Sequence, residues 1–134
     1  MRWTIEEGAD RGWWRVATSG RFSSDGHVRM VNDILSRPGW HPGTDVLFDH
    51  RDLDWDGSGF ETMFRAVQTH RAFEEQIGDG KAAFLVAGAV AYANARQFEL
   101  LLGEQTSTHF LVTHDEDEAI GWLEDCSADS SAPT

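Results

Sequence analysis

The stretch 44–60, Thr-Asp-Val-Leu-Phe-Asp-His-Arg-Asp-Leu-Asp-Trp-Asp-Gly-Ser-Gly-Phe, is the segment around which the fold is expected to form. Its residues 46–48, Val-Leu-Phe, are apolar on successive positions, which is typical of a central strand covered on both faces. The carboxylates that follow predict a turn, and apolar residues at helical spacing from residue 60 predict a long amphipathic helix. We therefore expect a buried strand, an acidic turn and a helix start in immediate succession.

Upstream of this strand, the pattern predicts a β-hairpin and then a helix. Residues 2–6 and 13–19 each alternate their side chains, and the Gly- and Asp-rich loop between them favours antiparallel pairing. Residues 23–25, Ser-Ser-Asp, can cap a helix, because a side-chain oxygen there can accept from a free first-turn N–H. The apolar positions of this helix continue to Leu35, and Pro38 stops it.

Downstream of the acidic turn, helices and strands alternate. The first helix is expected to end at 78–80, Gly-Asp-Gly, and to carry His70 on its polar or boundary side. A strand over 82–87, a helix from about 91 to 102, a strand over 108–113 and a short closing helix complete the pattern. Five apolar residues are expected on the core face of the first of these helices: Phe60, Met63, Phe64, Val67 and Phe73.

The predicted order of elements is ββαβαβαβα, which indicates an α/β fold with a mixed sheet. Strand–helix alternation from the third strand onward implies parallel pairing with right-handed crossovers, after an antiparallel N-terminal hairpin. Residues 1–124 are expected to form one domain, and residues 125–134 a flexible acidic and Ser-rich tail.

Composition excludes several classes of partner. The chain has 134 residues and a net charge of −12, which argues against binding to nucleic acid or to anionic lipid surfaces. No apolar run reaches the roughly 20 residues of a membrane span or has the form of a signal peptide. The single cysteine, Cys126, cannot form an intramolecular disulfide, so we expect a cytoplasmic protein.

Three segments resemble a known group of proteins. They are the hairpin leading into 20–22, Gly-Arg-Phe; the strand 45–51, Asp-Val-Leu-Phe-Asp-His-Arg, with the helix after it; and the closing segment 115–123, Asp-Glu-Asp-Glu-Ala-Ile-Gly-Trp-Leu. Through them the chain, apart from its tail, resembles SpoIIAA-like domains, in the branch that joins STAS domains with CRAL-TRIO-like lipid-binding proteins. The resemblance implies a compact cytoplasmic domain, usually without catalysis, that acts as a regulatory binding module.

Ser58 is a candidate phosphoacceptor. Some STAS members are switched by phosphorylation of a Ser or Thr at the start of the helix after the central strand, and Ser58 occupies about that place. A helix N-terminus would stabilise a phosphoserine, whereas three nearby carboxylates, Asp52, Asp54 and Asp56, would oppose its charge. The alternative interpretation is that Ser58 caps the helix.

No metal or cofactor is expected. Alternating carboxylates at Asp52, Asp54 and Asp56 match the start of a calcium loop, but its twelfth position is Met63 rather than Glu. The six histidines lack zinc-ligand spacing, and no P-loop or dinucleotide fingerprint is present.

The pair His50-Arg51 is the main ligand-facing candidate. It is predicted just beyond the C-terminal end of a parallel strand, the edge where α/β sheets favour ligands. Tyr92, Arg96 and His114 should gather at the same edge, so the five residues could line one anion-accepting pocket. The alternative is that Arg51 makes a local ion pair and braces the loop.

Three functions are consistent with these patterns. The first is a non-enzymatic regulatory or protein-interaction module, with a protein partner or self-association through partly exposed tryptophans: Trp13, Trp40 and Trp55. The second is a carrier of a small apolar or lipidic ligand, which requires an internal cavity lined by residues such as Phe60, Phe64, Leu85 and Phe98. The third is a small enzyme that uses His50, Arg51 or His114.

Overall fold

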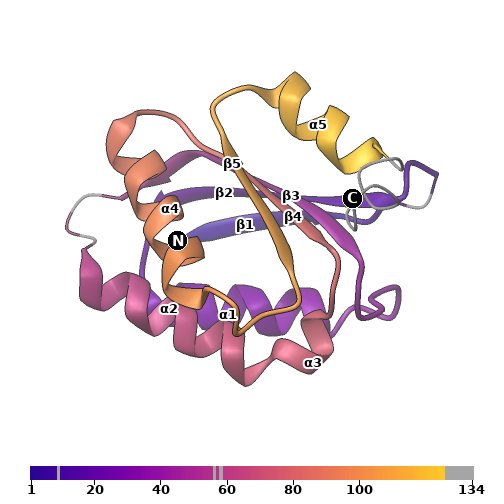
Figure 1. Cartoon of the computed structure of the whole chain (residues 1–134), viewed down its shortest axis with the longest axis horizontal. Helices are drawn as coiled ribbons and strands as arrows, with labels where there is room; N and C mark the ends of the chain where they lie inside the picture. The colour runs from indigo at the N-terminus through magenta and orange to yellow at the C-terminus, as the bar shows by residue number, and fades with distance from the viewer. Residues whose placement is uncertain (9, 56, 58, 126–134) are drawn as a thin grey trace.

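A five-stranded mixed sheet forms the centre of the molecule in the computed structural model (Figure 1), which describes residues 1–8, 10–55, 57 and 59–125. The strands lie in the order β1-β2-β3-β4-β5; β1 pairs with β2 antiparallel, and each later pair is parallel. The predicted α/β class and mixed sheet, with an antiparallel N-terminal pair and then parallel strands, are confirmed; the short helix α3 is additional to the predicted order of elements. The elements are β1 Arg2–Glu6, β2 Trp13–Arg21, α1 Ser24–Leu35, β3 Asp45–Asp54, α2 Phe60–Ala72, α3 Glu74–Ile77, β4 Lys81–Leu85, α4 Ala89–Leu102, β5 His109–Thr113 and α5 Glu116–Glu124.

The helices form two unequal layers on the sheet. Helices α1, α2 and α4 pack on one face, and α5 lies on the other, as Figure 1 shows. The alternation along β2 sets this division: Trp14 and Val16 pack under α1, whereas Trp13 packs under α5. The face that carries α1, α2 and α4 is called the helical face below.

Strand β3 is longer than the pattern of residues 46–48 predicted. It continues through Asp54, so His50 and Arg51 lie within the strand rather than beyond its end. Ala17 pairs with Asp49 while Ser19 pairs with Asp52, which marks an extra residue in β3. This bulge reverses the alternation of side chains along β3. As a result Leu53 and Trp55, at odd positions, join His50 on the helical face.

The face of helix α2 that packs against the core differs from the predicted one. Its buried residues are Met63, Ala66, Val67 and His70, at the spacing of one helical face. Phe60 and Phe64 lie outside this stripe, with 60% and 40% of their surfaces exposed. The prediction of a polar or boundary position for His70 is therefore wrong, as is the core position of the two phenylalanines.

Two tryptophans that were expected to be partly exposed are buried. Trp55 is buried because the β3 bulge directs it inward, where it stacks on Phe22 with ring centroids 5.1 Å apart. Trp13 is buried under α5, and its indole N–H donates to Glu124 at 2.9 Å. Trp40 is half-buried, in agreement with the prediction.

A close backbone contact joins the loop before β3 to the loop before β4. Gly78 ends α3 with φ 83°, a conformation that favours glycine. A Cβ atom at Gly78 would lie 2.3 Å from the backbone nitrogen of Gly43. This position therefore tolerates no side chain without movement of the backbone.

Candidate ligand-binding site

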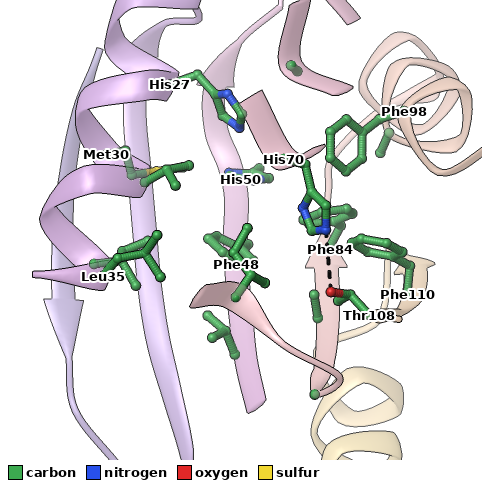
Figure 2. A pocket seen from close by; sticks show the side chains of 18 of the residues that line it. His27, Met30, Leu35, Phe48, His50, His70, Phe84, Phe98, Thr108 and Phe110 are labelled. Carbon is green, nitrogen blue, oxygen red and sulfur yellow. Dashed lines mark hydrogen bonds between the residues drawn. The ribbon is translucent and has the colours of Figure 1, made fainter. Parts of the chain in front are cut away.

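A cavity of about 100 Å³ lies between helices α1 and α2 and the helical face of the sheet. Figure 2 shows its side chains converging from α1, β3, β4, α2, α4 and β5. For comparison, an engineered apolar cavity of roughly 150 Å³ is large enough to bind benzene. The space is therefore suited to a small molecule rather than to a long lipid chain.

Aromatic rings form much of the cavity wall. Phe84 on β4 is central: its ring centroid lies 5.5 Å from that of Phe48 and 5.5 Å from that of Phe110. Phe98 of α4 meets Phe84 edge-on at 5.8 Å. Of the residues expected to line an apolar cavity, Phe98 does so, whereas Leu85 packs under α5 and the two exposed phenylalanines of α2 point away. Planar rings in offset and edge contacts favour flat or compact apolar ligands.

His50 contributes a buried imidazole to the cavity. Its Nδ1 atom lies 2.7 Å from the hydroxyl of Thr18 on the neighbouring strand. Burial lowers the pKa of His50 to about 3, and the nearby His27 adds to the effect, so the ring is neutral at pH 7. No described residue forms a hydrogen bond with its Nε2 atom.

His70 contributes a second imidazole from α2. Its Nε2 atom lies 3.1 Å from Oε1 of Glu74 and 3.0 Å from the hydroxyl of Thr106. Burial lowers the pKa of His70, although the Glu74 carboxylate partly opposes that shift. The neutral ring is therefore the resident form at neutral pH, and one of its nitrogens is already committed to protein.

His27 of α1 supplies the third imidazole. Its ring packs on Phe22 with centroids 5.8 Å apart, and Figure 2 shows it pointing into the cavity. Although part of the residue is accessible, burial lowers the pKa of His27 to about 4, and His70 lowers it further. Within the described ranges, its ring nitrogens have no hydrogen-bond partner.

Trp55 adds an unsatisfied donor beside these rings. Its indole N–H is buried and has no acceptor among the residues that the structure describes. The ring lies 5.9 Å from His50 in an edge-on arrangement. Buried donors without partners are rare in folded proteins, so the indole N–H of Trp55 is a notable unpaired donor at this end of the cavity.

The predicted five-residue anion pocket does not exist. Adjacent residues of a strand point to opposite faces, so His50 enters the cavity while Arg51 lies under α5. There Arg51 contacts Asp49 at 2.8 Å and Glu116 at 3.0 Å, and Arg15 contacts the same two carboxylates. This four-residue network joins β2, β3 and α5, which agrees with the alternative of local ion pairs.

The other predicted site residues, Tyr92, Arg96 and His114, belong neither to the cavity lining nor to this ion-pair network. Tyr92 and His114 stack on each other with ring centroids 5.0 Å apart, near the start of α4. Arg96 pairs with Glu99 of its own helix. A binding role for these residues and for Trp55 stays a prediction, but they do not share one pocket.

Other sequence predictions concern residues that the structure does not describe. Ser58, Asp56 and residues 126–134, which include Cys126 and most of the expected tail, lie outside the described residues. Within the described part, no group of three His, Cys, Asp or Glu side chains is arranged to hold a metal ion. None of the described helices has the length and apolar character needed to cross a membrane.

Two residues of the cavity were missed by the sequence reasoning. His27 precedes the buried Met30 by three positions, and His70 follows the buried Val67 by three. This spacing places each histidine on the buried stripe of its helix. The spacing could therefore have identified both histidines; on α2, the more apolar phenylalanines favoured a different stripe as the core face.

Comparison with solved structures identifies the architecture. An uncharacterised DUF3478-family protein from Shewanella loihica PV-4, described as having a SpoIIAA-like fold, superposes with a TM-score of 0.58. The alignment covers 91% of this chain and 92% of that chain at 17% identity. This chain has a SpoIIAA-like fold. No protein-family model matches the SpoIIAA-like chain, and no curated protein matches it.

Proposed function

We propose that this SpoIIAA-like domain binds a small apolar molecule in the cavity between α1, α2 and the sheet, and carries or senses it without transforming it. The observation that supports this function is the cavity of about 100 Å³ itself, with aromatic walls and three neutral imidazoles. Natural interiors are normally packed without voids of this size. Small-molecule sites are usually concave and mostly apolar with a few convergent polar atoms, and this cavity has that character at a smaller volume than the typical roughly 300–1,000 Å³.

A non-catalytic role fits the chemistry of the cavity. Its described lining contains no carboxylate or thiol, and the Nζ atom of Lys81 is bound to the carbonyl oxygens of Trp122 and Asp125. His50 and His70 are neutral and held by hydroxyl groups, which suits recognition of a bound molecule. Thr108 is the lining hydroxyl that contacts His70, at 3.4 Å from Nε2, and its proton is donated to the carbonyl oxygen of Gly78.

Native mass spectrometry of protein purified from its own host tests this proposal. We expect an added mass that is lost on denaturation. The Ala82→Leu variant, which fills the cavity, should lack that mass, whereas the exposed control Ala93→Leu should retain it. A bare polypeptide mass in every sample, together with no heat of binding for added toluene, would falsify the proposed function.

A second candidate function is a regulatory or protein-interaction role, as in STAS domains. Phe60 and Phe64 stack with ring centroids 6.1 Å apart on the exposed side of α2, directly after the segment that contains Ser58. Exposed aromatic pairs of this kind favour contact with another protein. We propose that they form the partner surface and that phosphorylation of Ser58 changes its affinity.

Sedimentation velocity over a range of concentrations tests self-association through this surface. The double variant Phe60→Ser with Phe64→Ser should weaken any association, and Ser58→Asp should change it. Val90→Ser, at a similarly exposed position on α4, is the matched control. Identical, concentration-independent sedimentation of all four proteins would count against self-association.

A further inference from the structure

The hydrogen bonds around His70 determine which of its nitrogens carries the proton. The hydroxyl of Thr106 donates to Oε1 of Glu74 at 2.8 Å, and the hydroxyl of Thr108 donates to the carbonyl oxygen of Gly78 at 2.8 Å. Each hydroxyl has a single proton, so toward His70 both can only accept. The Nε2 atom, 3.0 Å and 3.4 Å from these oxygens, must therefore be the N–H donor.

Glu74 strengthens this assignment because it is a charged acceptor. Burial alone would raise the pKa of Glu74, but hydrogen bonds from the Ser107 backbone and the Thr106 hydroxyl hold it below its ordinary value. The ionised carboxylate lies 3.1 Å from Nε2 of His70 and cannot donate. A neutral imidazole protonated at Nε2 has an unprotonated Nδ1 with a free lone pair.

The Nδ1 atom of His70 faces the cavity. In Figure 2 one ring nitrogen of His70 points to Thr108 and the other points toward the space between α1 and the sheet. No described residue forms a hydrogen bond with Nδ1. The rings of Phe110 and Phe98 lie 5.6 Å and 6.0 Å from the imidazole, so its surroundings are otherwise apolar. A buried acceptor of this kind is satisfied only by a donor that enters the cavity.

The charge of the cavity restricts that donor to a neutral group. A carboxylate ligand would lose its hydration among neutral imidazoles, and an ammonium ligand would meet no carboxylate in the described lining. A hydroxyl group can donate to Nδ1 while the rest of the molecule packs on the aromatic wall. The volume of about 100 Å³ is smaller than the roughly 150 Å³ of a cavity that binds benzene, so the apolar body can be no larger than a single benzene ring.

We propose that the cavity recognises a small neutral alcohol or phenol, whose hydroxyl donates to Nδ1 of His70 while its apolar body packs against the phenylalanine rings. This inference rests on the proposed ligand-binding function and specifies the chemical class of the ligand. His70 acts as the specificity-determining residue, and Glu74 with Thr106 acts by keeping the proton on Nε2.

Phenol and toluene, which differ only by a hydroxyl and a methyl group, test the inference by isothermal titration calorimetry. Satisfying or losing one buried hydrogen bond is worth about 1–2 kcal/mol, or roughly tenfold in Kd. We expect the ratio of the toluene Kd to the phenol Kd to fall about tenfold in His70→Phe. The control His109→Phe, at an exposed histidine of β5, should leave the ratio unchanged.

Nitrogen-15 NMR of the wild-type histidine rings gives a second readout if His70→Phe does not fold. Nδ1 of His70 should resonate as an unprotonated nitrogen and should shift on addition of phenol but not of toluene. A proton on Nδ1, or equal Kd ratios in wild type and His70→Phe, would overturn this inference alone. Failure of both probes to bind at all would instead contradict the proposed ligand-binding function.

Discussion

Enlarging Ala82 to leucine tests whether the cavity is usable space. Ala82 lies on β4 between Val46 of β3 and Phe110 of β5, and its side chain lines the cavity. Leucine adds three carbon atoms to this position. In a filled core such a change forces side chains off their rotamers, whereas in a cavity it removes the carbon atoms from water without a clash.

The expected magnitude follows from burial. Three additional buried carbons stabilise the folded state by about 2.4 kcal/mol at roughly 0.8 kcal/mol each. Ordering the leucine side chain costs about 0.5–1 kcal/mol. Ala82→Leu should therefore raise the free energy of unfolding by about 1.5 kcal/mol. In a packed core the same substitution would lower it by about 1–3 kcal/mol, so the sign of the change is diagnostic.

The neighbouring Ala83 provides the matched control. It is fully buried on the opposite face of β4, where it packs under α5 with Leu47 and Leu123. Urea unfolding followed by tryptophan fluorescence should show Ala83→Leu destabilised by about 1–3 kcal/mol, with Ala82→Leu stabilised. Toluene binding should be lost in Ala82→Leu only. If Ala82→Leu is destabilised as strongly as Ala83→Leu, the cavity cannot accept added volume and the reasoning is refuted.

Four other predictions concern stability. The pKa of His50 falls from 6.5 to about 3 on folding, and the pKa values of His27 and His70 are also lowered, so below pH 6.5 the unfolded chain binds more protons than the folded one. Urea unfolding should show the free energy of unfolding falling with pH, with His50 alone contributing up to about 1.4 kcal/mol per pH unit. A flat profile from pH 7 to 4 would contradict this. Hydrogen bonds from Arg51 lower the pKa of Asp49 from 3.8 to about 2, so protonation of Asp49 should lower the free energy of unfolding between about pH 4 and pH 2. The Asp49→Asn variant should not show this part of the pH dependence. Gly78→Ala should lower the thermal midpoint and reduce the free energy of unfolding by at least about 2 kcal/mol. Gly121→Ala, at an open helical position, should instead increase the free energy of unfolding by about 0.5–1 kcal/mol. Equal effects of the two substitutions would disprove the close contact at Gly78. Phe60→Ser should change stability by less than about 0.5 kcal/mol, because 60% of the Phe60 surface is exposed, and a larger loss would place its ring in the core.

The order of elements could be predicted because it depends on local periodicity. Trp14, Val16 and Thr18 occupy alternate positions of residues 13–19, which places them on one face of β2, and the strand–helix alternation specifies parallel pairing. These patterns depend on side chains only a few positions apart. They can therefore be recognised in the sequence without knowing which elements pack against them.

The cavity could not be predicted because it depends on elements far apart in the chain. The bulge in β3 follows from its pairing with β2, and that pairing decides that His50 and Trp55 share a face while Arg51 does not. Periodicity alone also left the rotation of α2 open, since Phe60 and Phe64 compete with Ala66 for the core. Packing against α1 and α4 is what selects the stripe that ends in His70.

The sequence by itself determined the SpoIIAA-like order of strands and helices, since hydrophobic period and turn residues act locally. The tertiary structure alone decided that His27, His50 and His70 meet around one space. It also decided their chemistry, because burial makes the three imidazoles neutral and the partners of His70 place its proton on Nε2. Desolvation and hydrogen-bond geometry are properties of the assembled neighbours, and no single segment of the chain encodes them.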